Sequence, residues 1–93
     1  NAKLHKESNQ DQVERRFPFL EKYILPNKDI LEIGCSSGFM MDSFKSIGAN
    51  CIGVEPSGAF SDYLESQGYE VYEEVGDIKD KKFDVILNME IVY

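Results

Sequence analysis

The segment from residue 30 to residue 41, ILEIGCSSGFMM, restricts the possible folds more than any other part of the sequence. Its apolar start predicts a short buried strand, and the small residues 34–38 predict a tight turn. Apolar residues at helical spacing, Met40 and Phe44, follow at once. A strand that turns directly into a helix is typical of α/β proteins, so the sequence places the chain in that fold class.

Strands and helices alternate along the rest of the chain. The apolar runs at 51–55 and 83–88, with a weaker run inside 69–74, predict three more strands. Two helical patterns separate the strands at the start of the sheet. Apolar residues at helical spacing from Val13 to Ile24 predict a further amphipathic helix before residue 30, which is either kinked at Pro18 or begins afresh there. This order predicts a Rossmann-like open parallel sheet with right-handed crossovers and with helices on both faces.

The composition is that of a small acidic domain. The 93 residues carry a formal net charge of −7, which argues against nucleic acid as a partner. No apolar stretch approaches the roughly 20 residues of a membrane span, so no membrane partner is expected. Cys35 and Cys51 have neither a CxxC spacing nor the spacing of a metal site, and we interpret them as reduced thiols of a cytoplasmic protein.

The chain is expected to hold one folded unit behind a polar tail. Residues 1–10 are polar and are predicted to be flexible, which leaves residues 11–93 as the domain. The last segment, 83–93, has the pattern of a strand that runs into a helix where the sequence stops, so we expect a half-domain truncated at its C-terminus. The apolar strand at 83–88 would then form a sheet edge, which predicts self-association through this edge.

The turn at 34–38 fits more than one kind of site. It matches the G-x-S-x-G nucleophile elbow of hydrolases, but the only histidine, His5, lies far upstream in the polar tail. A serine without a base to take its proton is a poor nucleophile. A dinucleotide site needs G-x-G-x-x-G, whereas Ser36 and Phe39 stand at the second and third glycine positions.

A third kind of site uses the acid that precedes the turn. Glu32, Gly34 and Gly38 have the spacing E-x-G-x-x-x-G, and the small Ser36 between the glycines still lets a ligand approach the backbone. The next strand ends with Glu55, whose carboxylate is able to accept hydrogen bonds from both hydroxyls of a ribose. An acid on the second strand and a short turn without the diphosphate pattern favour a nucleoside that carries no diphosphate.

Three segments in this order, DILEIGCSSG, GVEPS and KFDVIL, resemble class I S-adenosylmethionine-dependent methyltransferases over roughly residues 13–93. The resemblance implies the N-terminal half, with strand order 3-2-1-4, of a seven-stranded methyltransferase sheet. It also implies S-adenosyl-L-methionine as the cofactor and methyl transfer to an acceptor. The segment GVEPS is similar to methyltransferases that act on small metabolites and sugars, which favours a small-molecule acceptor.

The resemblance also implies which residues hold the cofactor. Glu32 would bear on the ammonium group of its amino-acid part, and Glu55 would bind the ribose. An acid after the third strand would contact the adenine amino group, and Asp77 fits this role best by its GDI context, with Glu73 and Glu74 nearby. The expected cofactor-binding residues are Glu32, Gly34, Cys35, Ser36, Gly38, Glu55, Pro56, Asp77, Asn88 and Met89.

Alternatives stay open at this point. The alternative role of Glu32 is to cap the turn or to pair with a lysine. The alternative for Glu55 is that it is a solvated acid without a ligand. No catalytic residue is assigned, because Tyr93 stands where the family often has an acid, and the half-domain is expected to be inactive alone. The competing functions are an inactive methyltransferase-like binding module, which Ser36 in place of a glycine favours, and a dinucleotide-binding Rossmann oxidoreductase.

Overall fold

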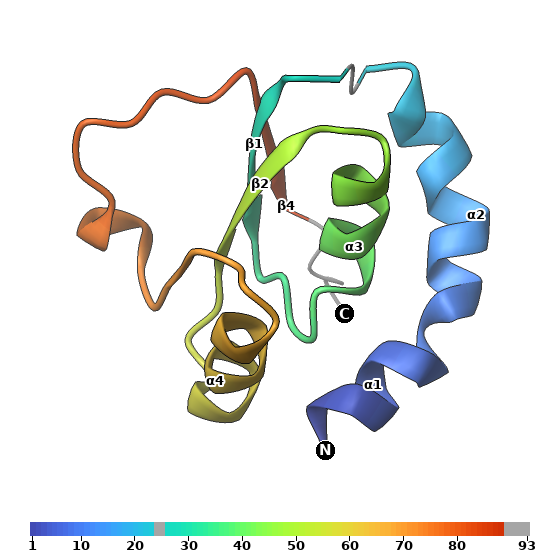
Figure 1. Ribbon diagram of the computed structural model, residues 1–93, viewed down its shortest axis with the longest axis horizontal. Helices are drawn as coiled ribbons and strands as arrows, with labels where there is room; N and C mark the ends of the chain where they lie inside the picture. Colours follow the sequence, from blue (N-terminus) through green and yellow to red (C-terminus); the bar gives the residue numbers. More distant parts are fainter. Residues whose placement is uncertain (24–25, 89–93) are drawn as a thin grey trace.

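The computed structural model describes residues 1–23 and 26–88, and it has one four-stranded parallel sheet (Figure 1). The strands are β1 (Asp29–Ile33), β2 (Asn50–Val54), β3 (Val71–Tyr72) and β4 (Val85–Asn88). The helices are α1 (Ala2–Ser8), α2 (Gln10–Glu21), α3 (Phe39–Ser46), α4 (Gly58–Ser66) and the 3-10 helix η1 (Val75–Asp77). The sheet order β3-β2-β1-β4 confirms the α/β class and the strand order expected from the sequence.

Strand β1 lies between β2 and β4 and pairs in parallel with both. Its last residue, Ile33, is in register with Val54 of β2 and with Asn88 of β4. Because parallel strands end at the same edge of a sheet, the residues that follow these three positions gather there. At the amino-terminal ends of the strands, the Asp84 carboxylate accepts a hydrogen bond of 2.9 Å from the backbone N–H of Asp29, which joins β1 to the start of β4.

Helices α2 and α3 cover one side of the sheet (Figure 1). Phe44 of α3 is fully buried together with Ile30 of β1, and the ring of Phe17 from α2 lies 6.0 Å from the Phe44 ring. A second cluster joins Met41 of α3 to Leu64 of α4. On the other side of the sheet in Figure 1 the helical element is η1, so in the part of the chain that the structure describes the two faces are covered unequally.

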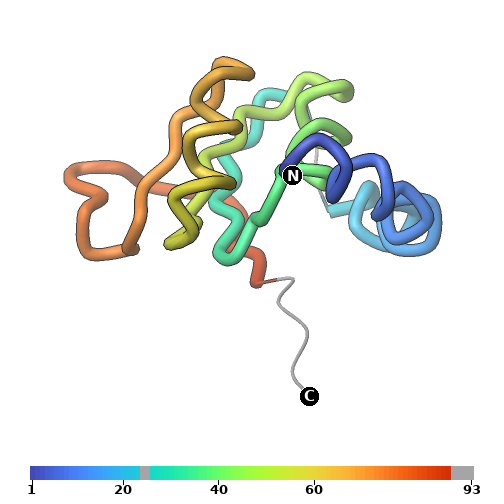
Figure 2. Tube along the Cα trace, turned by 90° about the horizontal axis from the view of Figure 1, so that it is seen from below, coloured from blue at the N-terminus to red at the C-terminus, as the bar shows by residue number. Residues whose placement is uncertain are grey.

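Residues Ala2–Ser8, which the sequence analysis places in a flexible tail, form helix α1. The Asn1 side chain accepts a hydrogen bond from the Leu4 N–H and caps the helix. Lys6 forms an ion pair of 2.8 Å with Asp42 of α3, and Figure 2 shows α1 beside the turn between β1 and α3. The polar composition suggests a tail because polar side chains make the ion pair and the hydrogen bond that join α1 to the rest of the fold, Lys6 with Asp42 and His5 with Ser37.

Helix α2 is continuous through Pro18, so it does not begin afresh at this residue. Pro18 has no backbone N–H, and the helix therefore lacks one of its internal hydrogen bonds there. The apolar residues Val13, Phe17 and Leu20 pack against the core and hold the helix across this gap. Ile24, expected on the same face, lies outside the described residues. No helix in residues 1–23 or 26–88 is long and apolar enough to cross a membrane.

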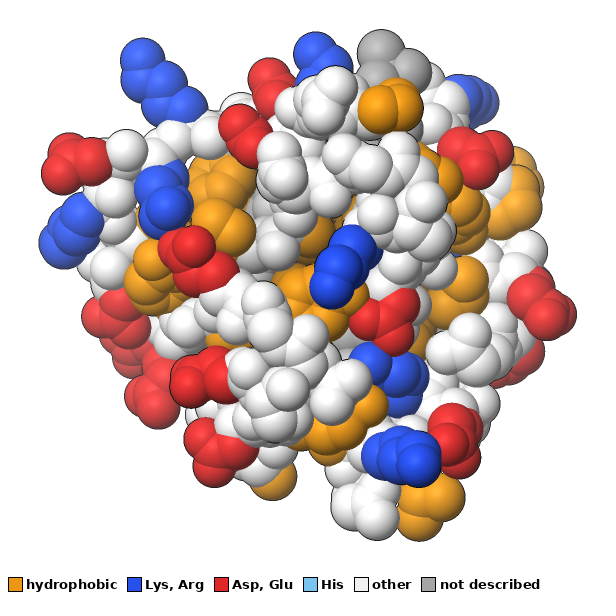
Figure 3. All heavy atoms as spheres, in the orientation of Figure 1, with side chains coloured by type: hydrophobic (Ala, Val, Ile, Leu, Met, Phe, Trp, Pro, Cys, Tyr) orange, Lys and Arg blue, Asp and Glu red, His pale blue; other side chains and the backbone are white. Residues whose placement is uncertain are grey.

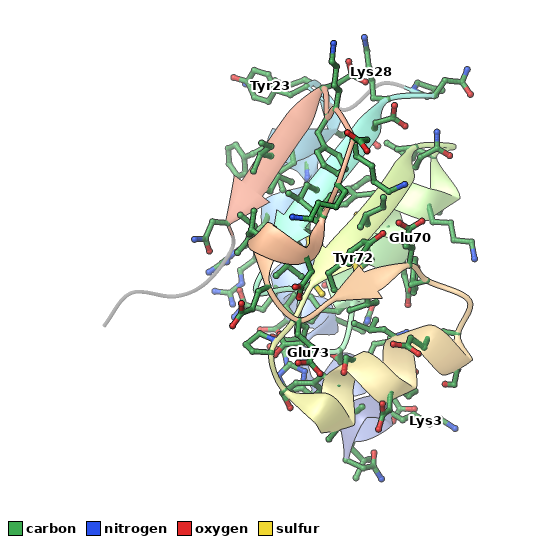
Figure 4. All side chains as sticks on the ribbon, turned by 90° about the vertical axis from the view of Figure 1, so that its left-hand side faces the viewer. Lys3, Tyr23, Lys28, Glu70, Tyr72 and Glu73 are labelled. Atoms are coloured by element: carbon green, nitrogen blue, oxygen red, sulfur yellow. The ribbon has the colours of Figure 1, made fainter. Side chains whose placement is uncertain are left out.

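Strand β4 lies at an edge of the sheet and exposes part of its apolar surface. Val85 and Leu87 pack toward the core, whereas the intervening Ile86 is 62% exposed. Figure 4 faces this open side of the sheet, where the Tyr72 hydroxyl donates a hydrogen bond to Glu70. An exposed apolar residue on an edge strand favours strand pairing with a second copy of the chain.

We predict that Ile86→Lys lowers the self-association of the chain, because a charge on an edge strand opposes strand addition. Sedimentation velocity over a series of concentrations measures the change. Val75→Lys is the control, since Val75 is 49% exposed and lies in η1, away from the β4 edge. A wild-type chain that stays monomeric over the whole series would contradict the prediction.

Candidate functional site

The turn after β1 contains three residues with a left-handed backbone. Gly34, Ser36 and Gly38 have φ angles of 73°, 54° and 80°. The Gly34 N–H donates to the carbonyl of Val54 at 2.8 Å, which ties the turn to the end of β2. A left-handed conformation costs a residue with a side chain on the order of 1 kcal/mol. Ser36 therefore occupies a position at which glycine is the less strained choice.

Glu55 connects this turn to helix α4. Its carboxylate is buried; Oε1 accepts a hydrogen bond of 2.8 Å from the backbone N–H of Ser36, and Oε2 one of 2.9 Å from that of Ser57. Glu55 is thus not a solvated acid. These two N–H groups use two of the roughly four lone-pair positions of a carboxylate, so acceptor capacity remains for the hydroxyls of a ligand.

Glu32 has a different environment at the same edge of the sheet. Its side chain is 2% exposed, and Oε1 has no hydrogen-bond partner among the described residues. The oxygen therefore neither caps the turn nor pairs with a lysine in this part of the chain. Burial raises the pKa of Glu32 from 4.5 to about 8. An unpartnered buried carboxyl oxygen is costly, so Glu32 is a candidate to pair with a ligand.

Cys35 packs beneath the turn and is not a nucleophile. Burial chiefly, and then the charges of Glu32 and Glu55, raise the pKa of the Cys35 thiol to about 12, so it stays protonated at neutral pH. A Cβ atom added to Gly53 of β2 would lie 2.6 Å from Cys35 Sγ. The absence of a side chain at Gly53 therefore leaves room for Cys35 beneath the turn. A glycine inside an apolar strand pattern is a sequence signal for such a close approach, and it was not used to predict this role.

The remaining expected residues are placed at different parts of the molecule. Asn88 ends β4 in register with Ile33, at the same edge as the turn, and Pro56 is exposed directly after Glu55. Asp77 lies in η1, on the left in Figure 1, and its carboxylate accepts a hydrogen bond from the backbone N–H of Glu74. The structure does not bring Asp77 to the turn. Met89 lies outside the described residues.

Glu73 is the acid that the sheet places beside Glu55. Val54 is in register with Tyr72, and the Glu55 N–H donates to the Tyr72 carbonyl at 2.9 Å, so the next residue of each strand is an acid at the same edge. Glu73 is exposed and lies near α4 in Figure 4. The register therefore places Glu73, and not Asp77, next to Glu55.

His5 lies at the turn although it is 32 residues away from it in sequence. Its Nδ1 atom is 2.7 Å from Ser37 Oγ. Ser37 is fully buried, so its hydroxyl is not open to a substrate. Ser36, the residue at the elbow position, meets Glu55 through its backbone N–H and not His5. The hydrolase interpretation thus gains a histidine near the turn, but this histidine contacts the buried Ser37 and not the elbow serine.

A family model described as a methyltransferase domain matches residues 5–93, nearly the whole chain. The chain belongs to the methyltransferase family. The match confirms the resemblance found in the sequence, and it begins at residue 5, so it includes most of α1 in addition to residues 11–93. The chain matches no curated protein at a significant level.

The raised pKa of Glu32 predicts that this methyltransferase loses stability as the pH rises. Between about pH 4.5 and pH 8 the folded state keeps the Glu32 proton and the unfolded state loses it, so each pH unit in this window costs on the order of 1 kcal/mol. We expect Glu32→Gln, which stays neutral, to remove this dependence. Urea unfolding of both proteins across the window measures it, and parallel pH profiles would contradict the prediction.

Gly38 is predicted to be intolerant of a side chain. An added Cβ would lie 2.5 Å from Leu64 Cδ2, and the φ of 80° disfavours any other residue, so Gly38→Ala should lower the free energy of unfolding by more than about 1 kcal/mol. Gly58→Ala is the matched control, because nothing lies within 4 Å of its added Cβ and alanine is favoured in a helix. Equal stabilities of the two variants in chemical denaturation would refute this account of the turn.

Proposed function

We propose that this methyltransferase uses S-adenosyl-L-methionine and transfers its methyl group to a small-molecule acceptor. The observation that carries the proposal is the pair of buried carboxylates beside the turn. Glu32 has an unpartnered oxygen, and Glu55 has unused acceptor positions, at the edge where ligands bind in open α/β sheets. Membership in the methyltransferase family supports the same conclusion.

The residues present fit this cofactor. Glu32 Oε1 would pair with the ammonium group of the amino-acid part, and the positive charge would favour the ionised form of a carboxyl that is otherwise held neutral by burial. Glu55 would accept hydrogen bonds from the ribose hydroxyls. Between the two acids, the half-buried Gly34 and Ser36 are small enough to let a ligand approach the backbone of the turn.

We assign the adenine side of the site to Glu73 in place of Asp77. Glu73 follows β3 directly beside Glu55, whereas Asp77 lies in η1, away from the turn. An exposed acid next to the ribose-binding carboxylate is in a suitable place to accept a hydrogen bond from the adenine amino group.

The bound cofactor supplies a methyl group on a sulfonium, which an acceptor atom displaces in line. The protein contributes alignment of the two reactants, worth up to ~7–11 kcal/mol in favourable systems. A general base is needed only where the acceptor must lose a proton before or during the transfer. For this reason the proposal names no catalytic residue.

The structure around Ser36 supports cofactor binding, so the serine does not by itself favour an inactive binding module. The serine adopts the left-handed conformation that a glycine would take, and its N–H reaches Glu55. The serine thus keeps a bond between the turn and Glu55 at the end of β2. The cytoplasmic setting and the inactivity of this chain alone remain predictions.

Calorimetric titration with S-adenosylhomocysteine tests the proposal, with NAD as the comparison ligand. We expect saturable binding of the former only, and Glu55→Gln should weaken it about tenfold or more, because the amide loses one acceptor oxygen and the negative charge. Glu65→Gln, at an exposed position of α4, is the matched control and should bind as the wild type does. Absence of binding by the wild-type chain, or equal binding of NAD, would overturn the proposed function.

A further inference from the structure

The hydroxyl of Ser37 links the turn to helix α1 near the N-terminus. Ser37 is fully buried, and its Oγ atom is 2.7 Å from His5 Nδ1 of α1. The hydroxyl lies between the two left-handed residues Ser36 and Gly38. A movement of Ser37 therefore shifts both neighbours: Ser36, whose N–H bonds to Glu55, and Gly38, which lies against Leu64 of α4.

The imidazole ring of His5 is itself held in place. Its centroid lies 4.9 Å from that of Phe60 in α4 and 6.0 Å from that of Phe39, the first residue of α3. The backbone carbonyl of His5 accepts a hydrogen bond of 2.8 Å from the Asn9 side chain. The ring thus sits between the first turns of two helices that both begin at the ligand-binding edge of the sheet.

A second, separate attachment holds α1 in this place. The Lys6 ammonium forms an ion pair of 2.8 Å with Asp42 of α3 and lies 4.8 Å from the centre of the Tyr63 ring of α4. This attachment contacts the helices and not the turn. The structure therefore separates the docking of α1, through Lys6, from the contact that α1 makes with the turn, through His5.

We infer that His5 is a positioning residue for the cofactor: it holds Ser37 so that the turn keeps the shape that receives the cofactor. This inference rests on the proposed function. Without His5, the buried Ser37 hydroxyl lacks this hydrogen-bond partner. An unsatisfied buried polar group costs free energy, so the turn is expected to rearrange in a way that gives the hydroxyl another partner. The turn would then leave its binding shape, and the cofactor would have to restore that shape on binding.

The test is a double-mutant cycle read out by the affinity for S-adenosylhomocysteine. We expect His5→Ala to raise the dissociation constant about tenfold in the wild-type background and to have little effect in a Ser37→Ala background, because its partner hydroxyl is then absent. His5→Asn should recover much of the affinity, since its amide is able to replace the Nδ1 hydrogen bond. Lys3→Ala, an exposed position of the same helix (Figure 4), is the control and should leave the affinity unchanged.

Amide hydrogen exchange of residues 34–38 in the unliganded chain gives a readout that needs no cofactor. We expect faster exchange in His5→Ala than in the wild type or in Lys3→Ala. Unchanged exchange, or a His5→Ala effect on affinity of the same size with and without Ser37, would overturn the inference. A wild-type chain that binds no S-adenosylhomocysteine would overturn the proposed function instead, so the two failures are distinguishable.

Discussion

The buried carboxylate of Glu55 joins parts of the protein that are separate in the sequence. It accepts one backbone hydrogen bond from Ser36, in the turn after β1, and one from Ser57, at the beginning of α4. Bonds to an ionised acceptor are among the stronger hydrogen bonds of a protein, particularly when they are shielded from water. The end of β2 thereby sets the position of the turn relative to α4, on which Gly38 in turn packs through Leu64.

Glu32 and Glu55, the two acids at this end of the sheet, differ in the hydrogen-bond partners that the protein provides for their carboxyl oxygens. Glu55 is partnered by backbone N–H groups and helps to define the shape of the site, whereas the Oε1 atom of Glu32 has no partner among the described residues. A fold that buries a carboxyl group in this way gives up stability. The proposed function assigns this unpartnered oxygen to the ammonium group of the cofactor.

Much of the fold could be predicted because its signals are local. The short apolar runs and the small residues of the turn each depend on a few consecutive residues, and they predicted the strands. The strand order and the family followed from the resemblance that three of these segments carry. Helix α1 was missed because its attachments are polar contacts with distant residues, such as Lys6 with Asp42. Asp77 was preferred over Glu73 on a local motif, although the strand register decides which acid lies beside Glu55.

The sequence by itself determined the α/β class, the turn with its flanking acids Glu32 and Glu55, and the resemblance to methyltransferases. Tertiary structure decided which of these acids is left unpartnered, which acid stands next to Glu55, and that His5 reaches Ser37. The physical reason is the range of the interactions. Periodicity and turn chemistry act between neighbours along the chain, whereas burial and hydrogen bonding of a side chain depend on segments that only the packed sheet and helices bring together.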